Sequence, residues 1–151
     1  MSSFQLSRAT HIDAPPEQVR PLLVNFREWQ KWSPWEEVDP NLNRTYSGPD
    51  EGVGAHYHWS GNKQAGEGSM EIVKSEPQLV EVDLRFLKPF KATNVIRFEL
   101  TPANGGTDFN WVMTGQRNPL MSLMGKLFFD KSIGKDFEKG LASLKSAAEG
   151  S

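Results

Sequence analysis

The sequence of 151 residues contains no cysteine, no long apolar run and no concentrated block of basic residues. Without cysteine, disulfide bonds, thiolate metal ligands and cysteine nucleophiles are excluded. No apolar run approaches the ~20 residues needed to span a bilayer, and the N-terminal MSSFQLSRAT lacks the apolar region of a signal peptide. The net charge is −2 with both signs interspersed, whereas nucleic-acid binding normally uses a concentrated basic surface. We therefore expect a cytoplasmic protein that neither spans a membrane nor binds nucleic acid.

Motifs for nucleophilic catalysis, phosphate binding and metal binding are also missing. There is no G-x-S-x-G sequence, and no helix start follows Gly66–Gly68 or Gly105-Gly106, as a phosphate loop would require. His56 and His58 would project from one face of a strand, but zinc takes three or four ligands and the only further histidine is His11. We interpret His56 and His58 as solvent-facing and expect no metal site and no cofactor.

What the sequence does contain is a series of short segments typical of β-strands, divided by glycine, proline and asparagine. These dividers accept positive φ or preset φ, as tight turns require. Strands joined by such short links are antiparallel neighbours. The predicted strands cover residues 4–13, 43–47, 55–60, 66–75, 79–86, 91–101 and 107–115.

Helical spacing appears in two places. After Pro15 and Pro16 end the first strand, apolar residues recur at helical spacing across residues 19–26, with Pro21 among them. This predicts very short or bent helices, two of them after strand 1. A long C-terminal helix is predicted from Asn118-Pro119, where asparagine can cap and proline can start a helix.

The long helix carries two apolar stripes that do not line up with each other. The step from Phe128 to Ile133 is five residues, which shifts the second stripe around the helix. We expect a kink or bulge near Lys131, assisted by Gly134. The order strand, short helices, six strands, long helix predicts an α+β fold of one domain, residues 1–151, in which a seven-stranded curved antiparallel sheet packs around the helix.

Strand alternation separates the two faces of this sheet. Because successive side chains point to opposite faces, residues of one parity share a face. The apolar residues of each predicted strand fall on one parity, and almost every ionisable residue falls on the other. The face toward the helix should therefore be aromatic and poor in acids and bases, which counts against acid–base catalysis on it.

Arg8 is the exception, since it is in phase with the apolar residues of its strand. Burying an unpaired guanidinium is prohibitively costly, so Arg8 must find a carboxylate, reach the rim or face a ligand anion. Tyr57 is the main polar group of the same face, and Trp32 and Trp35 could line the mouth or cap the core. The candidate ligand-binding residues are Arg8, Trp32, Trp35, Tyr57, Trp59, Met70, Leu84, Phe86, Phe98, Trp111, Met113 and Phe128.

Four stretches of the sequence stand out, residues 32–40 (WSPWEEVDP), 52–62 (GVGAHYHWSGN), 66–72 (GEGSMEI) and 133–145 (IGKDFEKGLASLK). Together they resemble the polyketide cyclase/dehydrase-like branch of the START-related SRPBCC superfamily. The resemblance covers nearly the whole chain and implies a helix-grip fold, in which a seven-stranded antiparallel sheet grips the C-terminal helix around a hydrophobic cavity. It carries over no catalytic residue, because no catalytic motif matches residue by residue.

Three functions remain open at this point. The first is binding of an apolar or aromatic small molecule, lipid-like, polyketide-like or quinone-like, in the cavity between sheet and helix. The second is a cyclase or dehydratase acting in that cavity, with Arg8 or Tyr57 as polar participants and the wall holding the substrate folded. The third is a ligand-free interaction module of the co-chaperone type. We expect a hydrophobic small molecule as partner, and a monomer or weak homodimer.

Overall fold

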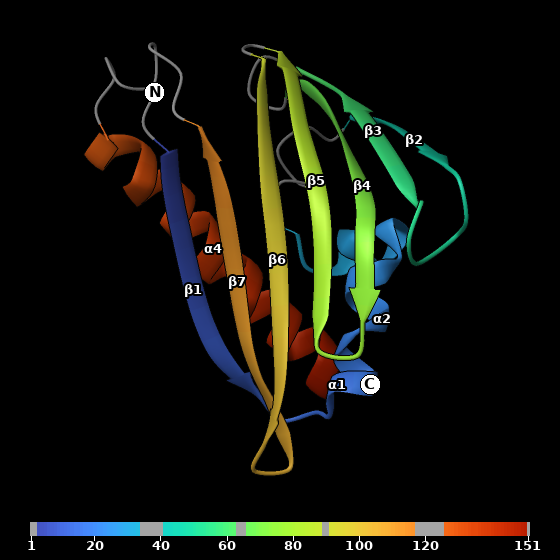
Figure 1. Ribbon diagram of the computed structural model, residues 1–151, viewed down its shortest axis with the longest axis vertical. Helices are drawn as coiled ribbons and strands as arrows, with labels where there is room; N and C mark the ends of the chain where they lie inside the picture. The colour runs from blue at the N-terminus through green and yellow to red at the C-terminus, as the bar shows by residue number, and fades with distance from the viewer. Residues whose placement is uncertain (1–2, 34–40, 63–65, 89–90, 117–125, 151) are drawn as a thin grey trace.

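The chain forms a seven-stranded antiparallel sheet that curves around a C-terminal helix (Figure 1). The computed structural model describes residues 3–33, 41–62, 66–88, 91–116 and 126–150, and their side chains except those of residues 3, 4, 116, 126–134 and 136. The strands lie in the spatial order β1-β7-β6-β5-β4-β3-β2. Strands β2 to β7 are therefore each next to their sequence neighbour, and β1 completes the sheet beside β7.

The strand predictions are confirmed, with every end within two residues of its predicted place. The hairpin between the two longest strands turns at Asn104 and Gly105, whose φ angles are 50° and 78°, the backbone that a tight two-residue hairpin needs. The strands are β1 (Ser3–Ile12), β2 (Asn43–Ser47), β3 (His56–Ser60), β4 (Glu67–Glu76), β5 (Leu79–Lys88), β6 (Ala92–Ala103) and β7 (Gly106–Gln116).

Two short helices follow β1, as the proline spacing predicts, and a 3₁₀ helix comes after them. They are α1 (Pro16–Val19), α2 (Pro21–Val24) and η1 (Phe26–Lys31). Pro16 and Pro21 each open a helix, where the missing N–H is not needed. Pro21 therefore divides the apolar stripe into two helices instead of bending one.

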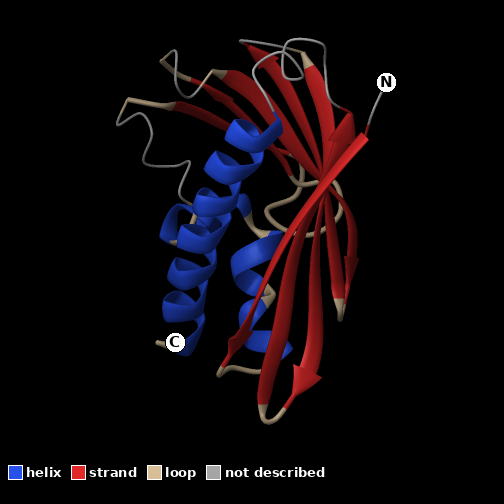
Figure 2. Cartoon of the chain, turned by 90° about the vertical axis from the view of Figure 1, so that its left-hand side faces the viewer, coloured by secondary structure: helices blue, strands red, loops and turns tan. Residues whose placement is uncertain are grey.

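The long helix α4 (Lys126–Glu149) lies across the concave side of the sheet, next to the short helices (Figure 2). It is helical without interruption over this range. The predicted start at Asn118-Pro119 lies outside the described residues, and the bend near Lys131 stays a prediction.

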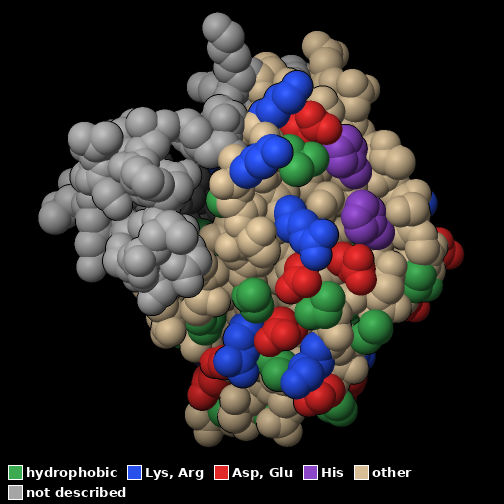
Figure 3. All heavy atoms as spheres, turned by 45° about the horizontal axis from the view of Figure 1, so that its top comes forward, with side chains coloured by type: hydrophobic (Ala, Val, Ile, Leu, Met, Phe, Trp, Pro, Cys, Tyr) green, Lys and Arg blue, Asp and Glu red, His purple; other side chains and the backbone are tan. Residues whose placement is uncertain are grey.

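The strand register confirms that the apolar parity faces the helix. In one row of cross-strand partners, Arg8 lies opposite Trp111, and Trp111 lies opposite Phe98. On the convex face, Arg97 pairs with Glu81 at 3.7 Å and with Glu99 at 3.9 Å. Figure 3 shows that charges of both signs are interspersed on this side of the molecule.

The centre of the concave side is packed with aromatic rings. Trp29 and Trp32 have ring centroids 4.7 Å apart, and Trp32 meets Trp111 edge-on at 5.5 Å. Both indole N–H groups donate to backbone carbonyls, Trp29 to Leu23 at 2.9 Å and Trp32 to Leu22 at 2.8 Å. These two tryptophans are therefore fixed in the core. They cover the lower half of the concave side, meaning the half toward the β4–β5 and β6–β7 turns in Figure 1.

Candidate functional site

The upper half of the concave side is arranged in two rows of side chains that cross the strands. The first row runs from β3 to β6 through Tyr57, Met70, Leu84 and Asn94, each lying opposite the next. Tyr57 is 3% exposed and Asn94 is 5% exposed. The row is therefore buried, and it carries polar groups at both ends.

The second row lies one step nearer the upper edge of the sheet and is less well covered. It runs through Trp59, Gly68, Phe86 and Ala92. The rings of Trp59 and Phe86 meet edge-on at 5.9 Å, and both side chains are only partly buried. Only glycine fits at position 68, because a Cβ there would overlap the Trp59 ring and the Arg85 carbonyl. The rings of Trp59 and Phe86 thus lie on the inward face and stay partly exposed to solvent.

Among the described strand residues, Arg44 lies on the concave face as well as Arg8, which corrects the sequence prediction that Arg8 is the one charged residue in phase. Arg44 lies opposite Trp59 in the register of β2 and β3, so it shares the face of that ring. Arg8 is half-buried, and its Nη1 donates to the Ser7 carbonyl at 2.8 Å in an exposed bond. Arg8 and Arg44 stand on β1 and β2, the two edge strands.

The predicted wall residues do not form one continuous surface. Phe98 and Trp111 are both fully buried against Trp32, and Met113 is 5% exposed. These positions belong to the packed lower half. Trp35 and the side chain of Phe128 lie outside the described residues.

Two hollows are lined by described residues, and neither touches the predicted wall. A small one of about 30 Å³ lies between η1 and the β2–β3 connection, beside Arg27, Tyr46 and His56. A groove of about 580 Å³ lies at the lower end, between α1, α2 and the β4–β5 and β6–β7 turns. Its lining includes the prolines Pro15, Pro16, Pro21, Pro77 and Pro102.

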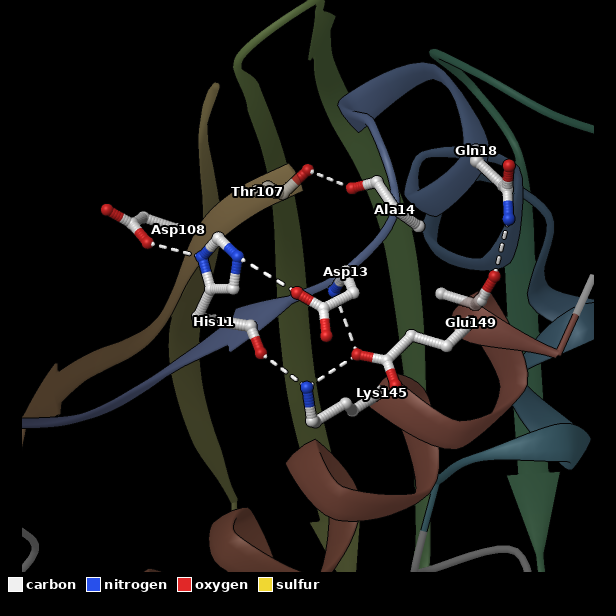
Figure 4. A network of polar contacts seen from close by, with 9 residues as sticks. His11, Asp13, Ala14, Gln18, Thr107, Asp108, Lys145 and Glu149 are labelled. Atoms are coloured by element: carbon white, nitrogen blue, oxygen red, sulfur yellow. Dashed lines mark hydrogen bonds and ion pairs between the residues drawn. The ribbon is translucent and has the colours of Figure 1, made fainter. Parts of the chain in front are cut away.

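A polar network at the lower end ties the C-terminal helix to β1 (Figure 4). Lys145 donates to the His11 carbonyl at 2.9 Å and pairs with Glu149, which also accepts from the backbone N–H of Asp13. The hydrogen bond between these two side chains raises the pKa of Lys145 and lowers the pKa of Glu149. Beside them, the His11 ring lies within 3.2 Å of Asp13 and 2.9 Å of Asp108.

The two convex-face histidines have separate neighbours. The His56 ring lies 3.3 Å from the Ser47 hydroxyl, and the His58 ring lies 2.9 Å from Glu67. In the part of the chain that the structure describes, no three His, Cys, Asp or Glu side chains are grouped to hold a metal ion.

A family model described as "Polyketide cyclase / dehydrase and lipid transport" matches residues 3–149. The chain belongs to this family. The resemblance to the SRPBCC superfamily is thereby confirmed, and so is the helix-grip fold. No curated protein sequence matches the chain.

Several solved structures share this fold over almost their whole length. A Staphylococcus aureus protein of unknown function, SA2116, superposes with a TM-score of 0.72 at 12% identity, covering 98% of this chain and 94% of that one. Ara h 8.0201 gives a TM-score of 0.64 at 13% identity, covering 99% and 100%. The Aha1 dimer from Colwellia psychrerythraea gives 0.64 at 19% identity, covering 97% and 96%. At these identities the likeness shows the fold alone.

None of the helices among the described residues combines the length and apolar character that crossing a membrane requires.

Proposed function

We propose that this SRPBCC domain binds an apolar or aromatic small molecule against the upper half of the concave sheet face. The observation that carries the proposal is the partial exposure of Trp59 and Phe86 on the inward face. Large aromatic side chains are expensive to leave in contact with water, and an apolar ligand laid against them would remove that contact.

The packing below the two rows limits where such a ligand can lie. Trp32 and Phe137 cover Trp111 from the side opposite the sheet, so the lower half is filled by the protein itself. The site is thus smaller than the wall predicted from the sequence. It consists of Tyr57, Trp59, Met70, Leu84 and Phe86, with Met70 able to adapt its shape to different ligands.

Binding is favoured over catalysis by the chemistry of these side chains. Among them only Tyr57 has an ionisable side chain, and it is 3% exposed, in the row beneath the partly exposed rings. General acid–base catalysis needs groups that exchange protons near neutral pH within reach of the substrate. Besides Tyr57, the described part of the upper face offers the guanidinium of Arg44, opposite Trp59, whereas Arg8 lies opposite Trp111 in the lower half.

The test is calorimetric titration with oleic acid, quercetin and menadione as representatives of fatty acids, flavonoids and quinones. We expect at least one to bind with a negative heat-capacity change, the mark of apolar burial. Ala92→Phe adds a ring beside Phe86, the cross-strand partner of Ala92, and should abolish that binding by filling the site. Binding of none of the three compounds would contradict the proposal.

Ala103→Phe is the matched control on the same strand. Ala103 lines the proline-rich groove at the opposite end of β6, so this variant should bind as the wild type does. If Ala103→Phe removes binding and Ala92→Phe does not, the ligand occupies the groove and the proposed site is wrong.

A further inference from the structure

Asn94 lies on the concave face among apolar neighbours. It stands between Leu84 of β5 and Gly115 of β7, its cross-strand partners, and two residues from Ile96 on its own strand. Leu84 and Ile96 are buried, Gly115 has no side chain, and Asn94 itself is 5% exposed. A carboxamide is therefore held inside an otherwise apolar part of the sheet.

Two other polar side chains of these strands have hydrogen-bond partners. Asn110 of β7 donates to Glu99 at 2.9 Å on the convex face, and the Thr107 hydroxyl donates to the Ala14 carbonyl at 2.7 Å. For the Asn94 carboxamide, no hydrogen-bond partner is found within the described residues. A mostly buried amide that has no partner among the described residues is less favourable there than a leucine of similar size. The Asn94 amide atoms are not among the fully enclosed atoms that lack a partner, so they keep some contact with solvent.

Asn94 also lies next to the partly exposed rings of the proposed site. Leu84, its cross-strand partner, is two residues from Phe86 on β5. Ala92, two residues from Asn94 on β6, is the cross-strand partner of Phe86. A ring stacked against Phe86 would therefore have its edge near the carboxamide.

We propose that Asn94 is the polar anchor of the ligand site and selects aromatic ligands that carry a neutral carbonyl or hydroxyl group. The inference rests on the proposed function. A carboxamide both donates and accepts hydrogen bonds, so it can pair with either group. It carries no charge to compensate an ionised ligand group in apolar surroundings, which disfavours carboxylates and ammonium groups at this point.

The experiment compares 2-naphthol with naphthalene, which differ only by the hydroxyl group, in calorimetric titrations at neutral pH. We expect the wild type to bind 2-naphthol about tenfold more tightly than naphthalene, the effect of one additional buried hydrogen bond. Asn94→Leu should lose this preference and keep its affinity for naphthalene. Asn94→Ala, which adds no bulk, should lose the preference as well.

Asn110→Leu is the matched control, because it removes the same side-chain type from the opposite face. It should retain the preference for 2-naphthol. Equal affinities in the wild type, or a preference that persists in both Asn94 variants, would overturn the assignment of Asn94 while leaving the proposed function intact. If the wild type binds neither compound, the assignment of Asn94 is overturned, and the titrations with oleic acid, quercetin and menadione decide separately whether the proposed function fails.

Stability gives a second readout that does not depend on any ligand. Asn94→Leu should raise the urea midpoint of the ligand-free protein, because it replaces a mostly buried carboxamide that has no partner among the described residues by an apolar side chain, whereas Asn110→Leu should not raise it. A lower midpoint for Asn94→Leu would show that the carboxamide is a structural group and would also overturn the assignment.

Discussion

The Phe137 ring of α4 lies nearly parallel to the Trp111 ring of β7, with centroids 4.2 Å apart and an interplanar angle of 14°. Both side chains are fully buried. This stack fixes the long helix on the sheet below the two rows of the proposed site. The helix is therefore held to the sheet by packing that a ligand in the upper half need not disturb.

Phe137→Ala should destabilise the protein by ~3–5 kcal/mol, since it removes a buried ring and leaves a cavity against Trp111. Urea denaturation measures the change. Glu138→Ala on the exposed side of the same helix is the control and should stay within ~0.5 kcal/mol of the wild type. Equal stabilities for the two variants would show that the stack does not hold the helix.

Gly68→Ala should displace the Trp59 ring, because the added Cβ would overlap that ring and the Arg85 carbonyl. We expect a loss of ~1–3 kcal/mol from overpacking and a changed tryptophan emission spectrum. Ser69→Ala, the next residue along β4 and on the opposite face, should change neither. An unchanged spectrum in Gly68→Ala would contradict the position of the ring.

Glu149→Gln should make the protein less stable at neutral pH but not in acid. Lys145 and the Asp13 N–H lower the pKa of Glu149 in the folded chain, so its stabilising contribution is present above the unfolded pKa. That contribution is lost as the pH falls through the folded pKa.

The urea midpoints of wild type and Glu149→Gln should therefore differ at pH ~7 and converge toward pH ~3. Glu138→Gln, at an exposed position of the same helix, serves as control and should follow the wild type throughout. A difference between Glu149→Gln and wild type that is independent of pH would show that the carboxylate charge is not what ties α4 to β1.

Local chemistry was sufficient to predict the strands. Glycine, proline and asparagine mark each turn, and the two-residue period of a strand assigns every apolar side chain to one face. The same period places Asn94 in phase with Ile96, so the sequence pattern itself indicates a polar side chain on the apolar face. Arg44 was missed because its strand, residues 43–47, is polar apart from Tyr46 and shows no apolar alternation.

The division of the concave side could not be predicted in the same way. Trp29 and Trp32 lie outside the periodic strands, and their burial depends on indole hydrogen bonds to Leu23 and Leu22 that only the folded chain provides. Once these rings fill the lower half, Phe98 and Trp111 become core residues. Sequence parity gives the face of a residue but not what packs over it.

The most direct test of the proposed site follows the tryptophan indole N–H resonances of ¹⁵N-labelled protein by NMR during titration with 2-naphthol. We predict that the Trp59 resonance shifts progressively and saturates, because Trp59 borders the site. The Trp29 resonance should stay in place, because its N–H is bonded to the Leu23 carbonyl in the sealed half. A saturating shift of Trp29 with Trp59 unmoved, or no shift of either at saturating ligand, would contradict binding at the upper half of the concave face.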